Sequence, residues 1–186
     1  ETLKRKSTKY PGITTTSLSH WLNPGTHIVR CMPNTPAQIQ SGITGLYATP
    51  QITETERNTA EEILSAVGET IWVQEESELN AVTAVSGSGP AYFFYMMEVM
   101  QDAAITLGLS PDIAQKLVLE TALGASKMAH AEIANKLPAQ LRREVTSPGG
   151  TTEAALNVLL ARDLSGIFSD AITAANARSI ELAKDA

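Results

Sequence analysis

The sequence predicts a short α/β part followed by an all-helical domain. Residues 27–74 alternate between short apolar runs that are typical of strands and one amphipathic stretch that is typical of a helix. From Glu75 onward the strand-like runs disappear, and apolar residues recur at helical spacing. We therefore expect an α/β remnant over residues 1–74 and an all-α domain over residues 75–186.

The α/β part opens with a basic, aperiodic stretch over residues 1–10, which is typical of a disordered arm or of a segment out of its normal context. Two prolines in Met32-Pro33-Asn34-Thr35-Pro36 cannot continue a hydrogen-bonded ladder, so a loop is expected there. The elements expected around this loop are a helix at 16–22, strands at 27–31 and 42–48, a helix at 53–67 and a strand at 69–74.

The second domain is expected to consist of helices at 77–85, 91–107, 110–130, 139–145, 153–160 and 164–184. The helices at 77–85 and 91–107 are separated by the small residues of Ser86-Gly87-Ser88-Gly89-Pro90. Alanine-rich stretches at 122–126 and 171–175 allow helices to approach closely. A helical domain of about 110 residues buries only a modest part of its surface, so we expect a second copy to cover the remainder in a homodimer.

Composition restricts the classes of partner. The chain has 186 residues and a net charge of −6, and no basic cluster follows Lys9, which argues against nucleic acid and anionic membranes. No apolar run reaches the roughly 20 residues of a membrane span. The single cysteine, Cys31, excludes an internal disulfide and is compatible with a reducing cytoplasm, the expected location. Three scattered histidines do not support a metal site.

A polar turn, Ser147-Pro148-Gly149-Gly150-Thr151-Thr152, precedes an apolar helical stretch and is the strongest candidate for a binding site. The glycines allow positive φ and close approach of a ligand, and both threonines are suited to cap the helix. Free N–H groups from Gly150 to Thr152, with the three hydroxyls, would suit a carboxylate or a phosphate. An ordinary helix connection whose hydroxyls only cap is an equally open interpretation.

Three segments together carry a resemblance to a known family: Met32-Pro33-Asn34-Thr35-Pro36, the run from Val85 to Tyr92, and the run from Val145 to Thr152. Their order and spacing resemble pyrroline-5-carboxylate reductase, over nearly the whole chain from Gly12 onward. The resemblance implies a Rossmann domain followed by an all-α dimerisation domain. It also implies hydride transfer from NADP (or NAD) in its reduced form to a cyclic imino acid, giving L-proline.

The resemblance also implies roles for individual residues. Thr152 would be the catalytic residue, with its hydroxyl near the ring nitrogen of the substrate. The substrate-binding residues would be Glu76, Ser147, Gly150, Thr151 and Thr152. The cofactor-binding residues would be Met32, Pro33, Asn34, Ser86 and Gly87, although a kink for tight helix packing is an equally open interpretation of the last two.

One departure from the family affects function. The sequence has no strand followed by a G-x-G-x-x-G turn, the feature that holds a dinucleotide pyrophosphate, so we interpret it as a truncated member that binds NADPH weakly or not at all. Two alternatives stay open: a catalytically inactive dimerisation fragment, and a related dehydrogenase that acts on another small acid. The choice between NADP and NAD, and assembly of dimers into a higher oligomer, are not decided by the sequence.

Overall fold

The computed structural model describes residues 12–184. The stretch 1–10, interpreted above as an arm, lies outside the described residues. The chain divides by its internal contacts into two compact units, one made of the residues up to Ala91 together with those from Ser169 onward, and the other of Tyr92–Phe168. This is a different division from the domain boundary expected between residues 74 and 75, which stays a prediction.

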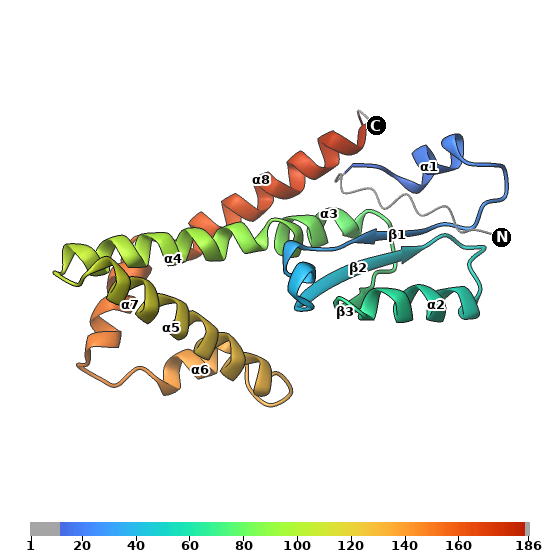
Figure 1. Ribbon diagram of the computed structural model, residues 1–186. Coiled ribbons are helices and arrows are strands. Elements are labelled where there is room, and N and C mark those ends of the chain that lie inside the picture. The colour runs from blue at the N-terminus through green and yellow to red at the C-terminus, as the bar shows by residue number, and fades with distance from the viewer. Residues whose placement is uncertain (1–11, 185–186) are drawn as a thin grey trace. The chain divides into compact units, whose positions relative to one another are not determined.

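A three-stranded sheet forms the centre of the first unit (Figure 1). Its strands are β1 (Val29–Met32), β2 (Gly42–Ala48) and β3 (Gly68–Trp72), in the order β1-β2-β3. β1 pairs antiparallel with β2, and β2 pairs parallel with β3. The described sheet is therefore mixed. Such sheets are common in α/β domains, where one edge strand often runs antiparallel to the others. The elements around it are α1 (Thr15–Trp21), the 3-10 helix η1 (Thr35–Ile39) and α2 (Glu54–Ser65).

Helices cover both faces of this sheet. Thr70 and Trp72 of β3 donate hydrogen bonds to Glu61 of α2, each at 3.3 Å. On the opposite face, Gly45 lies against α3 (Glu78–Val82), where a Cβ at position 45 would come within 2.7 Å of the Val82 side chain. Glycine is needed at this position because α3 approaches the sheet so closely. The core of the unit centres on Leu46 and Leu79, which are fully buried.

A π-helical turn, η2 (Thr83–Gly87), separates α3 from α4 (Gly89–Thr106). The Ser88 N–H donates to the Thr83 carbonyl at 2.8 Å, and the buried Thr83 hydroxyl donates to the Leu79 carbonyl at 2.7 Å. The interruption was expected at Ser86–Pro90 but begins three residues earlier. Because the π turn forms hydrogen bonds between residues five apart, the backbone N–H and carbonyl groups at the interruption stay hydrogen-bonded.

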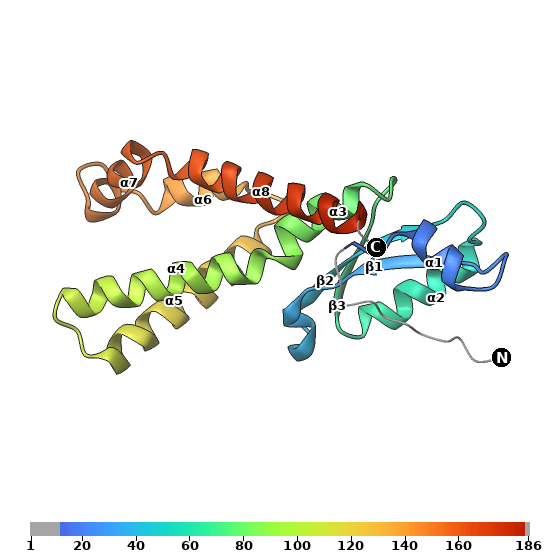
Figure 2. The same cartoon turned by 90° about the horizontal axis from the view of Figure 1, so that it is seen from above.

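Helices make up the second unit, where α5 (Pro111–Ala131) turns back after the end of α4 (Figure 2). α6 (Pro138–Glu144) and α7 (Thr151–Ala161) follow, and α8 (Leu164–Lys184) begins here and continues into the first unit. Ser110 caps α5, with its hydroxyl accepting the Ile113 N–H at 3.5 Å. Within residues 92–168, all of which the structure describes, Ala114 and Val118 are the buried hydrophobic residues.

An α/β remnant followed by an all-helical part is the architecture observed, as expected from the sequence. Several expected bounds differ from those observed by one to three residues, and two of them have a clear structural reason. Met32 belongs to β1 rather than to the following loop, and the segment after it folds into η1. β3 ends at Trp72 instead of Gln74, because the chain turns there into the approach to α3, where the Glu78 carboxylate accepts the N–H groups of Gln74 and Glu75.

Candidate active site

The turn before α7 is a closed β-turn over residues 147–150. The Gly150 N–H donates to the Ser147 carbonyl at 3.0 Å, and Gly149 has a φ of +71°. Proline at the second position and glycine with positive φ at the third are the requirements of a type II turn. The expectation of a free N–H at Gly150 was therefore wrong, because closing the turn uses that group.

Three N–H groups nevertheless remain open at the start of α7, those of Thr151, Thr152 and Glu153. Among the described residues none of them has a hydrogen-bond acceptor, and the first bond of the helix is that from Ala154 to Gly150 at 3.1 Å. The N-cap is Gly150, which has no side chain to close the helix end. The expectation that the two threonines cap the helix was therefore wrong, since they are its first two residues.

Another helix of the same chain shows what a closed start looks like. At α2 the Thr53 hydroxyl accepts the Glu56 N–H at 3.3 Å, and the Glu56 carboxylate accepts the Thr53 N–H at 2.8 Å. This reciprocal pair satisfies two donors of the first turn. At α7 the glycine in the cap position leaves the corresponding N–H of Glu153 available, and open N–H groups at a helix start attract an anion.

Glu153 makes a contact that the sequence analysis missed. Its Oε2 accepts the Gly149 N–H at 2.7 Å, one residue further back than in an ordinary capping box. A glutamate at the third helical position was visible in the sequence as the available signal. The contact was not predicted because the sequence indicated a threonine, rather than Gly150, as the N-cap of the helix.

Two of the segments expected to meet the cofactor come together in the first unit. The Met32 side chain lies against Gly87, where a Cβ would come within 2.7 Å of the Met32 methyl carbon. Asn34 is held by its side chain, whose Oδ1 accepts the Ile43 N–H at 3.0 Å. Ser86 donates to the Val82 carbonyl at 3.0 Å, so its hydroxyl supports the π turn. Pro33 lies between Met32 and Asn34, half-buried like both of them.

Glu76 joins three segments of the first unit. Its carboxylate accepts the N–H and hydroxyl of Thr15 at 2.7 and 2.6 Å, and a hydrogen bond from Arg30 Nη1 at 2.9 Å. The Arg30 side chain is 10% exposed and that of Glu76 is 23% exposed, so solvent screens the pair only partly. The carboxylate thus fixes α1 and β1 relative to the start of α3.

The site residues expected from the sequence fall in both compact units. Ser147, Gly150, Thr151 and Thr152 lie in the second unit, on one turn and the helix that follows it. Glu76 and the expected cofactor residues lie in the first. Within its own unit, each group is held by the backbone and side-chain bonds described above. Their roles toward substrate and cofactor stay predictions.

Other kinds of site find little support in residues 12–184. This part of the chain contains no group of three or more histidine, cysteine, aspartate or glutamate side chains placed to hold a metal ion. Burial raises the pKa of the Cys31 thiol, which disfavours a reactive thiolate. No helix in the same range is long and apolar enough to cross a membrane.

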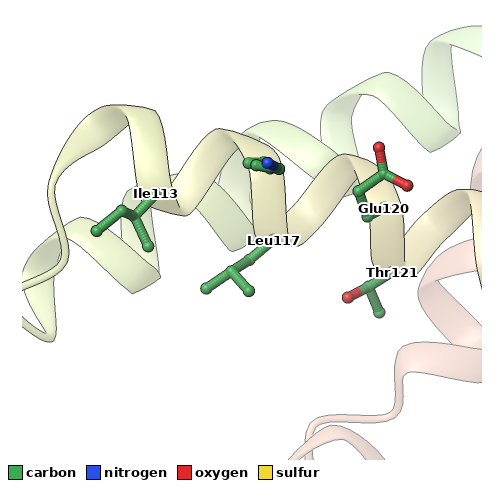
Figure 3. Close-up of a pocket in the computed structure, with 5 residues that line it drawn as sticks. Ile113, Leu117, Glu120 and Thr121 are labelled. Atoms are coloured by element: carbon green, nitrogen blue, oxygen red, sulfur yellow. The ribbon is translucent and has the colours of Figure 1, made fainter.

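A shallow recess on the second unit lies away from the turn before α7. One face of α5 lines it with Ile113, Lys116, Leu117, Glu120 and Thr121 (Figure 3). Ile113 and Leu117 are each more than half exposed, although both are large and apolar. A recess formed by a single helix face does not enclose a small molecule, so it is no rival to the turn as a substrate site.

Comparison with known proteins supplies the family. A sequence model described as pyrroline-5-carboxylate reductase dimerisation matches residues 76–182. The chain is 49% identical over 173 residues to a pyrroline-5-carboxylate reductase of Pseudomonas aeruginosa and 43% identical over 171 residues to that of Haemophilus influenzae. These alignments cover 93% and 92% of this chain and 63% of each relative.

The chain belongs to the pyrroline-5-carboxylate reductase family. Solved structures agree with this assignment: the reductase of Coxiella burnetii is similar with a TM-score of 0.88 and 46% identity, over 92% of this chain and 63% of that one. The Plasmodium falciparum pyrroline carboxylate reductase, solved with NADP bound, is similar with a TM-score of 0.84 and 27% identity, over 92% of this chain and 64% of that one. The chain thus spans slightly less than two thirds of the length of its relatives.

Proposed function

We propose that the full-length protein containing this chain reduces 1-pyrroline-5-carboxylate to L-proline with NADPH or NADH. The observation that carries the proposal is a helix start left open for an anion, at the turn from Ser147 to Thr152, in a chain 49% identical to a pyrroline-5-carboxylate reductase. The reaction saturates the ring C=N bond by forming one C–H bond and one N–H bond. NAD(P)H, when bound, supplies the hydride.

The turn before α7 would hold the substrate by its carboxylate. The open N–H groups of Thr151, Thr152 and Glu153 lie at the positive end of α7, beside the exposed residue Ser147. Gripping the carboxylate orients the imine carbon and removes the entropy cost of finding that orientation. The Thr152 hydroxyl would meet the ring nitrogen, the atom that gains a proton.

The first unit would present the nicotinamide end of the cofactor with Met32, Pro33, Asn34, Ser86 and Gly87. Gly87 has no side chain, and the methyl group of Met32 packs where its Cβ would be, so these two residues bring the π turn and the end of β1 together. Glu76 would keep this region rigid through Arg30 and Thr15. These residues would serve the nicotinamide end of the cofactor. The sequence of this chain contains no Gly-rich turn of the kind that holds the pyrophosphate.

A homodimer would complete the helical unit. Residues 92–168 carry most of the exposed large hydrophobic side chains of the described chain, including the aromatic run Phe93, Phe94 and Tyr95, each more than 60% exposed. Exposed apolar surface of this extent marks an interface. A second copy is the proposed cover because the matching family model is named for dimerisation. The expected cytoplasmic location and a higher assembly of dimers stay predictions.

The test is an assay of the full-length protein, following oxidation of NADPH and of NADH in the presence of 1-pyrroline-5-carboxylate. Oxidation of the reduced cofactor is expected with the imino acid and not with small keto acids, and no reduction of NADP+ or NAD+ is expected with small hydroxy acids. Turnover of another small acid in preference to the imino acid would favour the related dehydrogenase, and no turnover would favour a catalytically inactive protein. In a fluorescence titration, the 186-residue chain alone is expected to bind NADPH weakly or not at all, because it contains no Gly-rich turn.

A further inference from the structure

We propose that Glu153 is a positioning residue that holds the turn from Ser147 to Gly150 in its substrate-binding form. This inference rests on the proposed function and assigns a role to a residue that makes no contact with substrate itself. It starts from the 2.7 Å hydrogen bond that the Gly149 N–H donates to Glu153 Oε2.

The bond acts on one peptide unit, the one that links Pro148 to Gly149. Type I and type II turns differ in the orientation of this central peptide, and the φ of +71° at Gly149 places the turn in the type II class. Rotating the peptide would exchange its N–H for the Pro148 carbonyl oxygen on the side that faces Glu153. An oxygen facing a carboxylate is repelled, so the glutamate selects the observed orientation.

The Glu153 carboxylate lies outside the helix and occupies none of the open N–H groups of α7. An ordinary capping glutamate bonds to the N–H of the cap residue, as Glu56 does with Thr53. At α7 that N–H, on Gly150, is already bonded to the Ser147 carbonyl at 3.0 Å. The Glu153 carboxylate therefore reaches to Gly149, while the cap residue Gly150, which has no side chain, leaves the N–H groups of Thr151, Thr152 and Glu153 to a ligand.

Glu153 cannot receive the substrate carboxylate, because both groups are negatively charged. Glu153 favours substrate binding only by holding the turn in the observed conformation. Its negative charge opposes the binding of a second anion at the same helix start. Hydrogen bonding and charge thus act on substrate affinity in opposite directions. A glutamine keeps the accepting oxygen and removes the charge, so it separates the two effects.

Steady-state kinetics of the full-length enzyme test the inference with Glu153→Ala and Glu153→Gln. Glu153→Ala is expected to raise KM for the imino acid about fivefold, the factor that follows from losing one hydrogen bond of ordinary strength. Its kcat stays within about twofold, since a ground-state carboxylate contact is uniform binding. Glu153→Gln restores KM to the wild-type value or below. Glu181→Ala, which removes an exposed carboxylate paired with Arg178 on α8, is the control and changes neither constant.

A second readout needs no turnover. Hydrogen exchange at the Gly149 amide, followed by NMR, is expected to quicken severalfold in Glu153→Ala and to stay near the wild-type rate in Glu153→Gln. If the wild-type enzyme reduces no imino acid, the proposed function fails and this exchange still tests the turn. If the wild type is active and Glu153→Ala leaves KM unchanged, or if both variants raise KM equally, the positioning role is overturned while the reductase function stands. An unchanged exchange rate at Gly149 in Glu153→Ala overturns it as well.

Discussion

Thr152 is the residue on which the proposed chemistry depends most. Its hydroxyl caps nothing, since the N-cap of α7 is Gly150 and no side chain closes the helix start. Thr152→Ala in the full-length enzyme is expected to lower kcat/KM by about tenfold to a thousandfold, or about 1.4 to 4 kcal/mol, because help to the reacting nitrogen grows in the transition state. Steady-state kinetics at fixed NADPH measure the loss.

A purely structural role for Thr152 makes the opposite prediction. A capping threonine would cost about 1 kcal/mol of stability when replaced by alanine and would leave the kinetics of the folded enzyme intact. Thermal melting of the same variant provides the control, and we expect the melting temperature to stay close to that of the wild type. Normal kcat/KM in a folded Thr152→Ala enzyme would remove this residue from the site.

The sequence predicts part of the turn at the level of single residues. Both glycines were expected to allow positive φ, and Gly149 has it, whereas Gly150 has a φ of −83°. The bond that occupies the Gly150 N–H follows from closure of the turn in three dimensions, which residue types alone do not determine. The Glu153 contact could not be predicted for the same reason, since it depends on which residue begins the helix.

The start of α2 provides a pH-dependent test at the level of one element. The Thr53 backbone N–H, together with the Thr53 hydroxyl and His27, holds the pKa of Glu56 below its ordinary value of 4.5. Because the pKa of Glu56 is lower in the folded state, its ionised carboxylate stabilises the fold at pH values above the pKa that it has in the unfolded chain. This stabilisation is lost as the pH falls through the pKa of the folded state. The melting temperature of the wild type should therefore exceed that of Glu56→Gln above about pH 5.

Below pH 4.5 this difference should shrink progressively, because the wild-type glutamate becomes protonated and neutral like glutamine. Glu62→Gln, on the same helix but outside the capping box, is the control and should show no such trend. A difference in melting temperature that does not change between pH 6 and pH 3 would show that the charge of Glu56 contributes nothing to the cap.

A substitution in the π turn η2, beside the end of β1, tests the expected cofactor contacts. Gly87→Ala would place a Cβ 2.7 Å from the Met32 methyl carbon, the far end of a flexible side chain that shifts at little cost. We expect the fold to be retained and KM for NADPH to rise severalfold in the full-length enzyme, because the new methyl group and the shifted Met32 both take up room needed by the nicotinamide.

Gly124→Ala is the matched control, since a Cβ there meets nothing within 4 Å and lies within helix α5. It is expected to leave KM for NADPH unchanged, because α5 carries none of the expected cofactor residues. An unchanged KM for NADPH in Gly87→Ala would show that this position lies away from the cofactor.

Regular elements were predicted better than interruptions. β2 (42–48) and α8 (164–184) have the expected bounds, and in α8 a long helical period gives a repeated signal. The π turn was expected only as a break, and its start was misplaced by three residues. Over five residues the π and α periods differ too little for a sequence pattern to distinguish them.

Assembly is the prediction that belongs to the whole molecule. Leu117 lies in the exposed recess of α5 and is 53% exposed, as expected of a side chain that a second copy covers (Figure 3). Leu117→Glu should shift the full-length protein from dimer toward monomer, because a charge would be buried in an apolar contact. Light scattering at micromolar concentration measures the shift, with Glu62→Gln on the exposed side of α2 as a control outside the helical unit.

A wild-type protein that stays monomeric at that concentration would contradict the proposed dimer directly. A dimer unaffected by Leu117→Glu would instead place the interface on other helix faces. The need for a partner could be predicted from the sequence, because alanine-rich helices with few large residues leave apolar faces uncovered. Which side chains stay exposed depends on how α4 and α5 pack, and became visible only in the structure.

The central claim is that the turn from Ser147 to Thr152 binds the carboxylate of a cyclic imino acid. It is tested most directly by kcat/KM of the full-length wild type and of Ser147→Ala on two substrates, 1-pyrroline-5-carboxylate and 1-pyrroline, which lacks the carboxylate. Ser147→Ala is expected to lose about fivefold to tenfold on the first substrate, mainly through KM, and nothing on the second. Equal losses on both substrates, or a wild type that reduces both equally well, would contradict the account.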